Sequence, residues 1–179
     1  MRAIGLTALS SLALLLAGCP TDGGGNPIFQ NGEDVPERDP DEEWSGDLSE
    51  GEIIDLDWAT GGLGCFPGTE STNWSGSFVW YERTLGEDTD GWIRAIPGDP
   101  TIDISVMAIK SSVDSTEFPP ALTAGISCDT SYDRENNGNP GVSEAVKVLG
   151  GNEYRIVIGV AGANDTTSGA FDVQLWLGE

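Results

Sequence analysis

The spacing of apolar residues in the C-terminal part of the chain constrains the fold most. From Tyr154 to Ala161, and again from Ala170 to Leu177, apolar side chains occupy every second position. Since successive side chains of a strand point to opposite faces, this period of two predicts strands that each bury one face. The predicted core consists of the alternating residues Tyr154, Ile156, Ile158, Val160, Phe171, Val173, Leu175 and Leu177.

The rest of the chain after residue 48 consists of short apolar runs separated by Gly, Pro, Asn and Asp. No segment keeps a helical period for three turns, so we predict an all-β domain over 48–179, a single antiparallel β-sandwich of about eight strands. The expected strands are 53–58, 77–85, 92–96, 102–110, 121–128, 145–149, 154–161 and 170–177. Along 102–110, we expect Ile102, Ile104, Val106 and Ala108 to point inward, and Asp103, Ser105 and Met107 to point outward.

Composition excludes several classes of function. The 179 residues include 8 Lys+Arg and 30 Asp+Glu, which gives a net charge of −22 and a field that repels nucleic acids. The chain contains no histidine, so Ser-His-Asp and Cys-His nucleophiles and imidazole zinc sites are excluded. We predict no catalytic residue and no enzyme. A glycan hydrolase that uses two carboxylates is the alternative, although 30 acids place some pair at a suitable separation by chance.

The first 18 residues have the pattern of a secretory signal peptide. Arg2 precedes an apolar stretch over 3–17 that is too short for a comfortable membrane span. It ends in Leu16-Ala17-Gly18-Cys19, which resembles the lipobox of bacterial lipoproteins. The resemblance implies that Cys19 is acylated, becomes the mature N-terminus and anchors the chain in a membrane. Pro20, where Asp commonly marks inner-membrane retention, implies the outer membrane of a Gram-negative cell. The alternative is an ordinary signal peptide with an incidental thiol.

Residues 19–47 are predicted to form the lipidated end and a disordered acidic tether. Positions 20–47 hold nine acids against Arg38, with few apolar residues to offset the entropy of ordering. As a flexible chain this segment would span on the order of 30 Å. The alternative is an acidic docking segment for a basic partner.

Cys65 and Cys128 are the other two thiols, and an exported chain meets an oxidising compartment. We predict a disulfide between them, which would stabilise the domain by roughly 4 kcal/mol in the chain-entropy model. A redox-active thiol or a zinc site fits these two cysteines less well than a disulfide, because the sequence has no C-x-x-C spacing and no histidine.

Two further groups are candidates for ligand contact. The polar run 129–139 offers Asp129, Asp133 and Glu135 as oxygen ligands for calcium, but it equally suits a solvated loop, and no cofactor is predicted. The chain also has six tryptophans. Trp176 is out of phase with the core residues of its strand, and Trp80 and Tyr81 are adjacent, so at least two of these three rings are expected on an outer face. There they are possible ligand contacts suited to sugar stacking, the alternative being partial burial under loops.

Three segments, 73–81, 146–158 and 168–175, together resemble a bacterial pre-peptidase C-terminal (PPC) domain. The closing part reads Gly151-Asn152-Glu153-Tyr154-Arg155-Ile156, followed by Gly169-Ala170-Phe171-Asp172-Val173. The resemblance covers roughly 48–178. It implies a jelly-roll β-sandwich that serves as an accessory module on secreted proteins, in some members binding calcium or polymeric substrates.

These observations favour a non-enzymatic, lipid-anchored lipoprotein of the cell envelope with a β-sandwich binding or accessory module. Its expected partners are the membrane, through the acyl chains, and an envelope protein or glycan. A carbohydrate- or calcium-binding surface module is one alternative. An envelope protein that only crowds the surface with negative charge is another.

Overall fold

A computed structural model describes residues 35–122, 124–131 and 140–178 of the chain. The signal peptide, Cys19 and most of the expected tether lie outside these residues, as do Asp133 and Glu135. Within the described ranges, no helix is long and apolar enough to cross a membrane.

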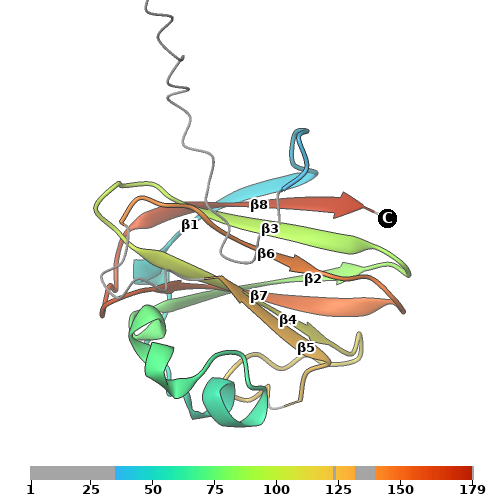
Figure 1. Cartoon of the computed structure of the whole chain (residues 1–179), viewed down its shortest axis with the longest axis horizontal. Coiled ribbons are helices and arrows are strands. Elements are labelled where there is room, and N and C mark those ends of the chain that lie inside the picture. The colour runs from blue at the N-terminus through green and yellow to red at the C-terminus, as the bar shows by residue number, and fades with distance from the viewer. Residues whose placement is uncertain (1–34, 123, 132–139, 179) are drawn as a thin grey trace, which may run out of the picture.

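The domain consists of two four-stranded antiparallel sheets packed face to face (Figure 1). The first sheet has the order β1-β8-β3-β6, and the second β2-β7-β4-β5. The strands are β1 Glu42–Asp47, β2 Phe78–Leu85, β3 Asp90–Pro97, β4 Ile104–Ser111, β5 Ser127–Ser131, β6 Glu144–Val148, β7 Tyr154–Gly162 and β8 Ala170–Gly178. Because the chain crosses repeatedly between the sheets in this order, the topology is a jelly roll, and the predicted all-β sandwich is confirmed.

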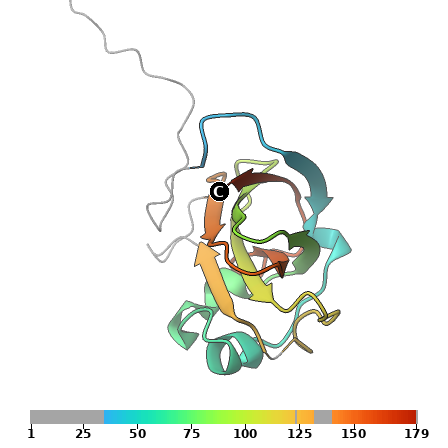
Figure 2. The same ribbon diagram turned by 90° about the vertical axis from the view of Figure 1, so that its right-hand side faces the viewer.

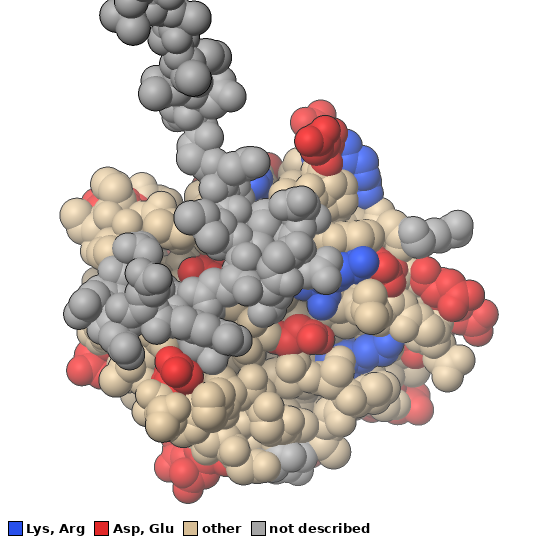
Figure 3. All heavy atoms as spheres, viewed as in Figure 1, with Lys and Arg blue, Asp and Glu red and all other residues tan. Residues whose placement is uncertain are grey.

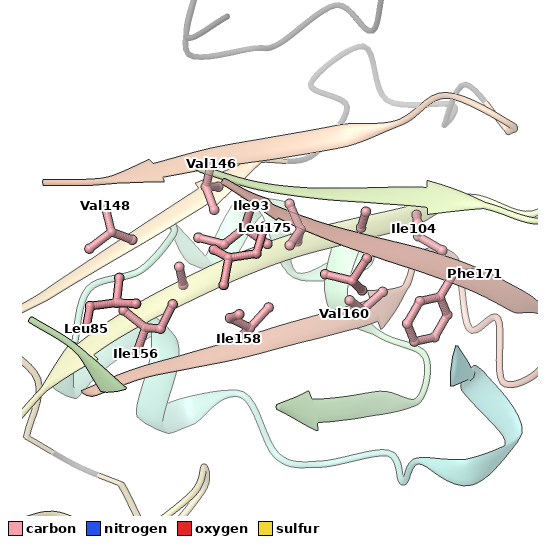
Figure 4. Close-up of a cluster of buried hydrophobic side chains, with 14 of the residues drawn as sticks. Leu85, Ile93, Ile104, Val146, Val148, Ile156, Ile158, Val160, Phe171 and Leu175 are labelled. Carbon is pink, nitrogen blue, oxygen red and sulfur yellow. The ribbon is translucent and has the colours of Figure 1, made fainter. Parts of the chain in front are cut away.

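The main core lies between the two sheets, where side chains from both inner faces meet (Figure 4). Seven of the eight predicted core residues are buried in it, and Leu177, at the end of β8, is half-buried against it. The cluster also includes Ile93, Val146 and Val148 from β3 and β6, and further residues from β2, β4 and the segment after β1. The alternation of apolar residues in the sequence therefore predicted the main core correctly.

The outer face of the second sheet is also buried, which corrects the expected outward positions. Met107 is fully buried, and Asp103 and Ser105 are buried as well. The reason is a cover of non-strand segments, seen below β4 and β5 in Figure 1 and again beneath the sandwich in Figure 2. Side chains of this cover and of the outer face of the sheet form a second cluster. It contains Trp58, Ala59, Cys65, Phe66, Trp74, Phe78, Met107, Ile109, Leu122, Val157 and Ala161.

Two predicted strands are wrong because their apolar residues belong to this cover. Residues 53–56 are irregular, and the chain continues as a π-helical turn, η2 (Trp58–Gly62), and a 3-10 helix, η3 (Gly68–Trp74). The predicted strand 121–128 is displaced, since β5 begins only at Ser127. Leu122 instead packs into the cover through a turn in which its N–H bonds the Phe118 carbonyl at 3.0 Å. The other six predicted strands match β2, β3, β4, β6, β7 and β8 within two residues.

The domain begins before residue 48, because β1 lies inside the expected tether. Glu42–Asp47 pair antiparallel with β8, and Trp44 packs against the main core. The preceding residues are fixed to the end of β8, since the Asp41 carboxylate accepts the Leu177 N–H at 2.7 Å and pairs with Arg38 at 2.8 Å. The acidic composition of this segment did not indicate a strand, because the Trp44 indole is the one large apolar side chain that β1 packs against the core.

The predicted disulfide is confirmed. Cys65 and Cys128 are joined with a Cα–Cα distance of 5.1 Å, which ties the cover to β5. Thr130 reinforces the junction by donating its hydroxyl to the Cys65 carbonyl at 3.3 Å.

Candidate binding groove

A groove of about 550 Å³ lies on the side of the sandwich where the edge strands β1 and β2 face each other. We call it the edge groove. Its walls come from β1, from the short 3-10 helix η1 (Leu48–Glu50) with the two residues after it, and from the first half of β2. The lining residues are Ser45, Glu50, Gly51, Glu52, Phe78, Val79, Trp80 and Tyr81.

The strand β2 carries the aromatic side chains of the groove. Its sequence, Phe-Val-Trp-Tyr-Glu-Arg-Thr-Leu, is rich in the aromatic and β-branched residues that favour strands. Alternation sends Phe78 and Trp80 toward the cover and Val79 and Tyr81 toward the main core. Trp80 and Tyr81 therefore both reach the groove, from opposite faces of the same strand.

Trp80 ends a stack of aromatic rings. Its ring lies nearly parallel to that of Phe78, with 5.2 Å between centroids and an angle of 13°, and the stack continues to Trp74 at 6.3 Å. Gly159 on β7 lies beneath the indole, where an added Cβ would come within 2.4 Å of Trp80 Cζ3. The indole is thus held flat against the sheet and remains only half-buried.

Tyr81 is held by Trp44 and Phe171, with ring centroids 5.4 Å and 6.4 Å away in edge-to-face arrangements. Gly46 on β1 leaves space for the phenol, because a Cβ there would lie 2.1 Å from Tyr81 Oη. Burial, and secondarily the charge of Glu50, raise the pKa of Tyr81. The phenol therefore stays neutral at physiological pH and keeps its hydroxyl proton.

An ion pair closes one end of the space between β1 and β2. Arg83 Nε lies 2.6 Å from the Glu42 carboxylate, and the guanidinium stands over the Trp44 ring at 5.0 Å from its centroid. This contact joins the two sheets beyond Tyr81. The groove is therefore bounded at this end and extends toward the start of β2.

The charges that line the groove are acidic. Glu50 and Glu52 are exposed on its wall. The wall is positioned by Asp47, whose carboxylate accepts the Ser49 N–H at 2.8 Å and the Gly169 N–H at 3.3 Å, and these bonds lower the pKa of Asp47. On the face shown in Figure 3, the few Lys and Arg side chains lie next to Asp and Glu side chains.

The wall contacts β2 directly through one pair of backbone bonds. Glu52 N–H donates to the Phe78 carbonyl at 3.3 Å, and Phe78 N–H donates to the Glu52 carbonyl at 2.9 Å. Gly51 permits this approach, since a Cβ there would lie 2.1 Å from the Phe78 oxygen. The bridge is isolated, and β2 continues beyond it as an edge strand.

Trp176 is not on an exposed surface, contrary to the prediction. It is only 2% exposed, because residues before β1 cover it and its Nε1 donates to the Arg38 carbonyl at 2.8 Å. The Arg94 guanidinium stands over its ring at 5.2 Å. The prediction followed the alternation of β8 correctly but omitted the segment that covers this face.

Asp129 is the one candidate calcium ligand inside the described residues. It lies half-buried on β5, where burial raises its pKa, and it accepts a hydrogen bond from the Ser127 hydroxyl at 3.4 Å. In the described part of the chain, no three His, Cys, Asp or Glu side chains gather as a metal site would require.

Sequence reasoning missed the acidic wall and β1 altogether. Glu50 and Glu52 have no local signal, because their position depends on a single backbone bridge to a strand more than twenty residues away. Trp44 is the available signal for β1, since a large apolar side chain in an acidic stretch indicates a residue that becomes buried.

Comparison with known proteins found a distant likeness among solved structures. No family model matches the chain, and no curated protein matches it. Among solved structures, the fold is similar to that of CorA, a surface-associated copper-binding protein important in copper acquisition by Methylomicrobium album BG8. The identity is 10%, the match covers 59% of this chain and 83% of that chain, and the TM-score is 0.40. A TM-score of this size supports no inference about ligand or activity.

Proposed function

We propose that this chain is a non-enzymatic lipoprotein of the bacterial cell envelope whose jelly-roll domain binds a ligand in the edge groove. The observation that carries the binding role is the groove itself, where an indole, a neutral phenol and two carboxylates surround the edge of a strand. These groups provide contact area and hydrogen bonds, which are the means of recognition. The absence of histidine from the sequence also favours binding over catalysis.

The proposed location rests on the lipobox resemblance of Leu16-Ala17-Gly18-Cys19. Fifteen residues lie between Cys19 and Val35, where the described chain begins. A flexible segment of that length has a root-mean-square span of roughly 20–25 Å, shorter than a tether ending at residue 47. The domain would therefore stay close to the membrane, and Pro20 favours the outer membrane of a Gram-negative cell.

Partition between membrane and soluble fractions tests the lipoprotein assignment. The full chain is produced in a Gram-negative host, and the wild type is compared with Cys19→Ser. We expect wild type in the membrane fraction and the variant in the soluble periplasmic fraction, because acyl chains supply the membrane affinity. The matched control, Cys65→Ser with Cys128→Ser, removes the other two thiols and should remain in the membrane. Equal solubility of wild type and Cys19→Ser would refute the anchor.

A carbohydrate is a second candidate ligand, favoured by the half-buried indole at the end of the aromatic stack. A glycan array with the Cys19→Ser protein tests it. Any sugar bound in the groove should be lost with Trp80→Ala and retained with Trp92→Ala, which alters a half-buried indole on the other sheet. A glycan whose binding is unaffected by Trp80→Ala would place the sugar elsewhere.

A further inference from the structure

Beyond the Glu52–Phe78 bridge, the edge groove is lined by the unpaired edge of β2. Phe78 directs its N–H and C=O away from β7, toward Glu52. Because these groups alternate in direction along an antiparallel strand, those of Trp80 and Glu82 point to the same open side. Among the described residues, the Trp80 N–H and C=O and the Glu82 N–H have no backbone partner there, and the Glu82 carbonyl accepts only the Arg83 side chain at 2.7 Å.

The edge of β2 differs from that of its neighbour β1. Glu42, Glu43 and Asp47 place charge along the six residues of β1, which is a common protection against pairing with another strand. The first four residues of β2, Phe78 to Tyr81, carry no charge and include three aromatic rings. A protein that leaves this stretch unprotected next to a groove has an edge suited to accepting a strand.

The shape of the groove matches an extended chain. Four consecutive residues of β2 line it, so it runs along the strand edge. The Glu52–Phe78 bridge occupies one end, and the Arg83–Glu42 ion pair bounds the other. An added strand would meet Trp80 on one face and Tyr81 on the other, so alternate side chains of that strand would contact different rings.

We propose that the edge groove binds an extended, cationic polypeptide segment of an envelope partner, which adds to β2 as a further strand. This inference rests on the proposed function and names its ligand class. Glu50 and Glu52 on the wall supply the charge complementarity, and the half-buried Trp80 lines the groove beside them. A second copy of this chain is disfavoured, since each copy carries a net charge of −22 and would bring the same two acids to the contact.

Two peptides test backbone pairing directly. The first is a capped seven-residue peptide of alternating Lys and Val, and the second has the same side chains with every backbone nitrogen methylated, so that neither of its edges keeps N–H donors. Titration into the Cys19→Ser protein should show binding of the first and loss of at least about tenfold in affinity for the second, because methylation removes the N–H donors of the added strand. Equal binding of both peptides would overturn strand addition.

Hydrogen exchange locates the added strand at single residues. The amides of Trp80 and Glu82 should exchange more slowly in the presence of the Lys-Val peptide, because they acquire acceptors. The amides of Val79 and Tyr81 already face β7 and should not change. Protection confined to other strands would overturn the assignment to β2.

Charge variants test the cationic preference. Glu50→Gln with Glu52→Gln should weaken the Lys-Val peptide by about tenfold and reduce the dependence on salt. Glu87→Gln, which alters an exposed acid in the β2–β3 turn, should leave the affinity unchanged. No binding of either peptide, together with normal membrane partition and a glycan dependent on Trp80, would overturn the peptide and leave the lipoprotein binding module in place. Failure of partition would instead overturn the anchor, whatever the peptides do.

Discussion

Two glycines determine where the aromatic rings of the edge groove lie. Gly159 lies under the Trp80 indole and Gly46 lies beside the Tyr81 hydroxyl, and in each case a Cβ would come within 2.4 Å of the ring or its oxygen. Because these contacts join β7 to β2 and β1 to β2, the groove depends on residues outside its lining. A sequence alone does not identify such positions, since a glycine in a strand also fits a bulge or a turn.

Gly159→Ala should displace the Trp80 indole and lower the free energy of unfolding by about 1–3 kcal/mol, the usual cost of overpacking. Urea unfolding followed by tryptophan fluorescence measures both effects. The matched control is Gly61→Ala in η2, where an added Cβ meets nothing within 4 Å and no loss is expected. Equal stability of the two variants would contradict the role assigned to Gly159.

Tyr154 gives a pH dependence at the other end of the sandwich. Burial, and secondarily the charge of Asp90, raise its pKa to about 12, and its hydroxyl donates to the Thr89 carbonyl at 2.7 Å. An unfolded tyrosine titrates near 10, so the folded protein holds this phenolic proton more tightly than the unfolded chain does. The resulting contribution to the free energy of unfolding is complete below about pH 10 and is lost as the pH rises toward 12.

Tyr154→Phe should therefore reduce the loss of stability between about pH 10 and pH 12, while costing about 0.5–1.5 kcal/mol at neutral pH for the lost hydrogen bond. Unfolding at several pH values, with phenolate absorbance of the folded wild type, checks both. A folded-state titration near 10 would contradict the raised pKa.

The elements differ in how far sequence predicts them. β7 and β8 were predicted within one residue, because alternate apolar positions supply the main core. β1, β5 and residues 53–58 were not, since their structure depends on contacts far along the chain. Trp44 is half-buried against the main core and Tyr81 of β2, and the apolar residues of 53–58 and 121–126 pack on the outer face of the second sheet or remain exposed.

The disulfide joins the cover to β5, so its removal should loosen this layer first. Cys65→Ala with Cys128→Ala is expected to lower the free energy of unfolding by about 2–5 kcal/mol, because the unfolded chain regains the entropy of an open loop. Hydrogen exchange should increase most in β5 and the cover and least in β3 and β8. A uniform increase across both sheets would contradict a local role.

At the scale of the whole domain, the described residues form a two-sheet sandwich with a cover on one side and the edge groove at one edge. The sequence predicted the sandwich, the disulfide and two of the aromatic residues in the groove, Trp80 and Tyr81. It did not predict the acidic wall or the burial of Trp176, because both require knowledge of where residues 36–52 lie on the folded domain.

Truncation tests the domain boundary. A chain that starts at Val35 keeps β1 and the Arg38–Asp41 contact with β8, whereas a chain that starts at Leu48 loses both and exposes Trp176. We expect the longer form to unfold cooperatively and the shorter form to melt at a lower temperature or to aggregate through the exposed edge of β8. Equal melting temperatures would contradict the inclusion of β1 in the domain.

The measurement that tests the account most directly is the intact mass of the full chain purified from membranes of a Gram-negative host. We expect a mature protein that begins at Cys19, carries the mass of a diacylglycerol and an additional acyl group, and lacks the two hydrogens lost when Cys65 and Cys128 form their disulfide. A chain cut at another residue with no acyl mass would contradict the membrane anchor and the envelope function proposed from it.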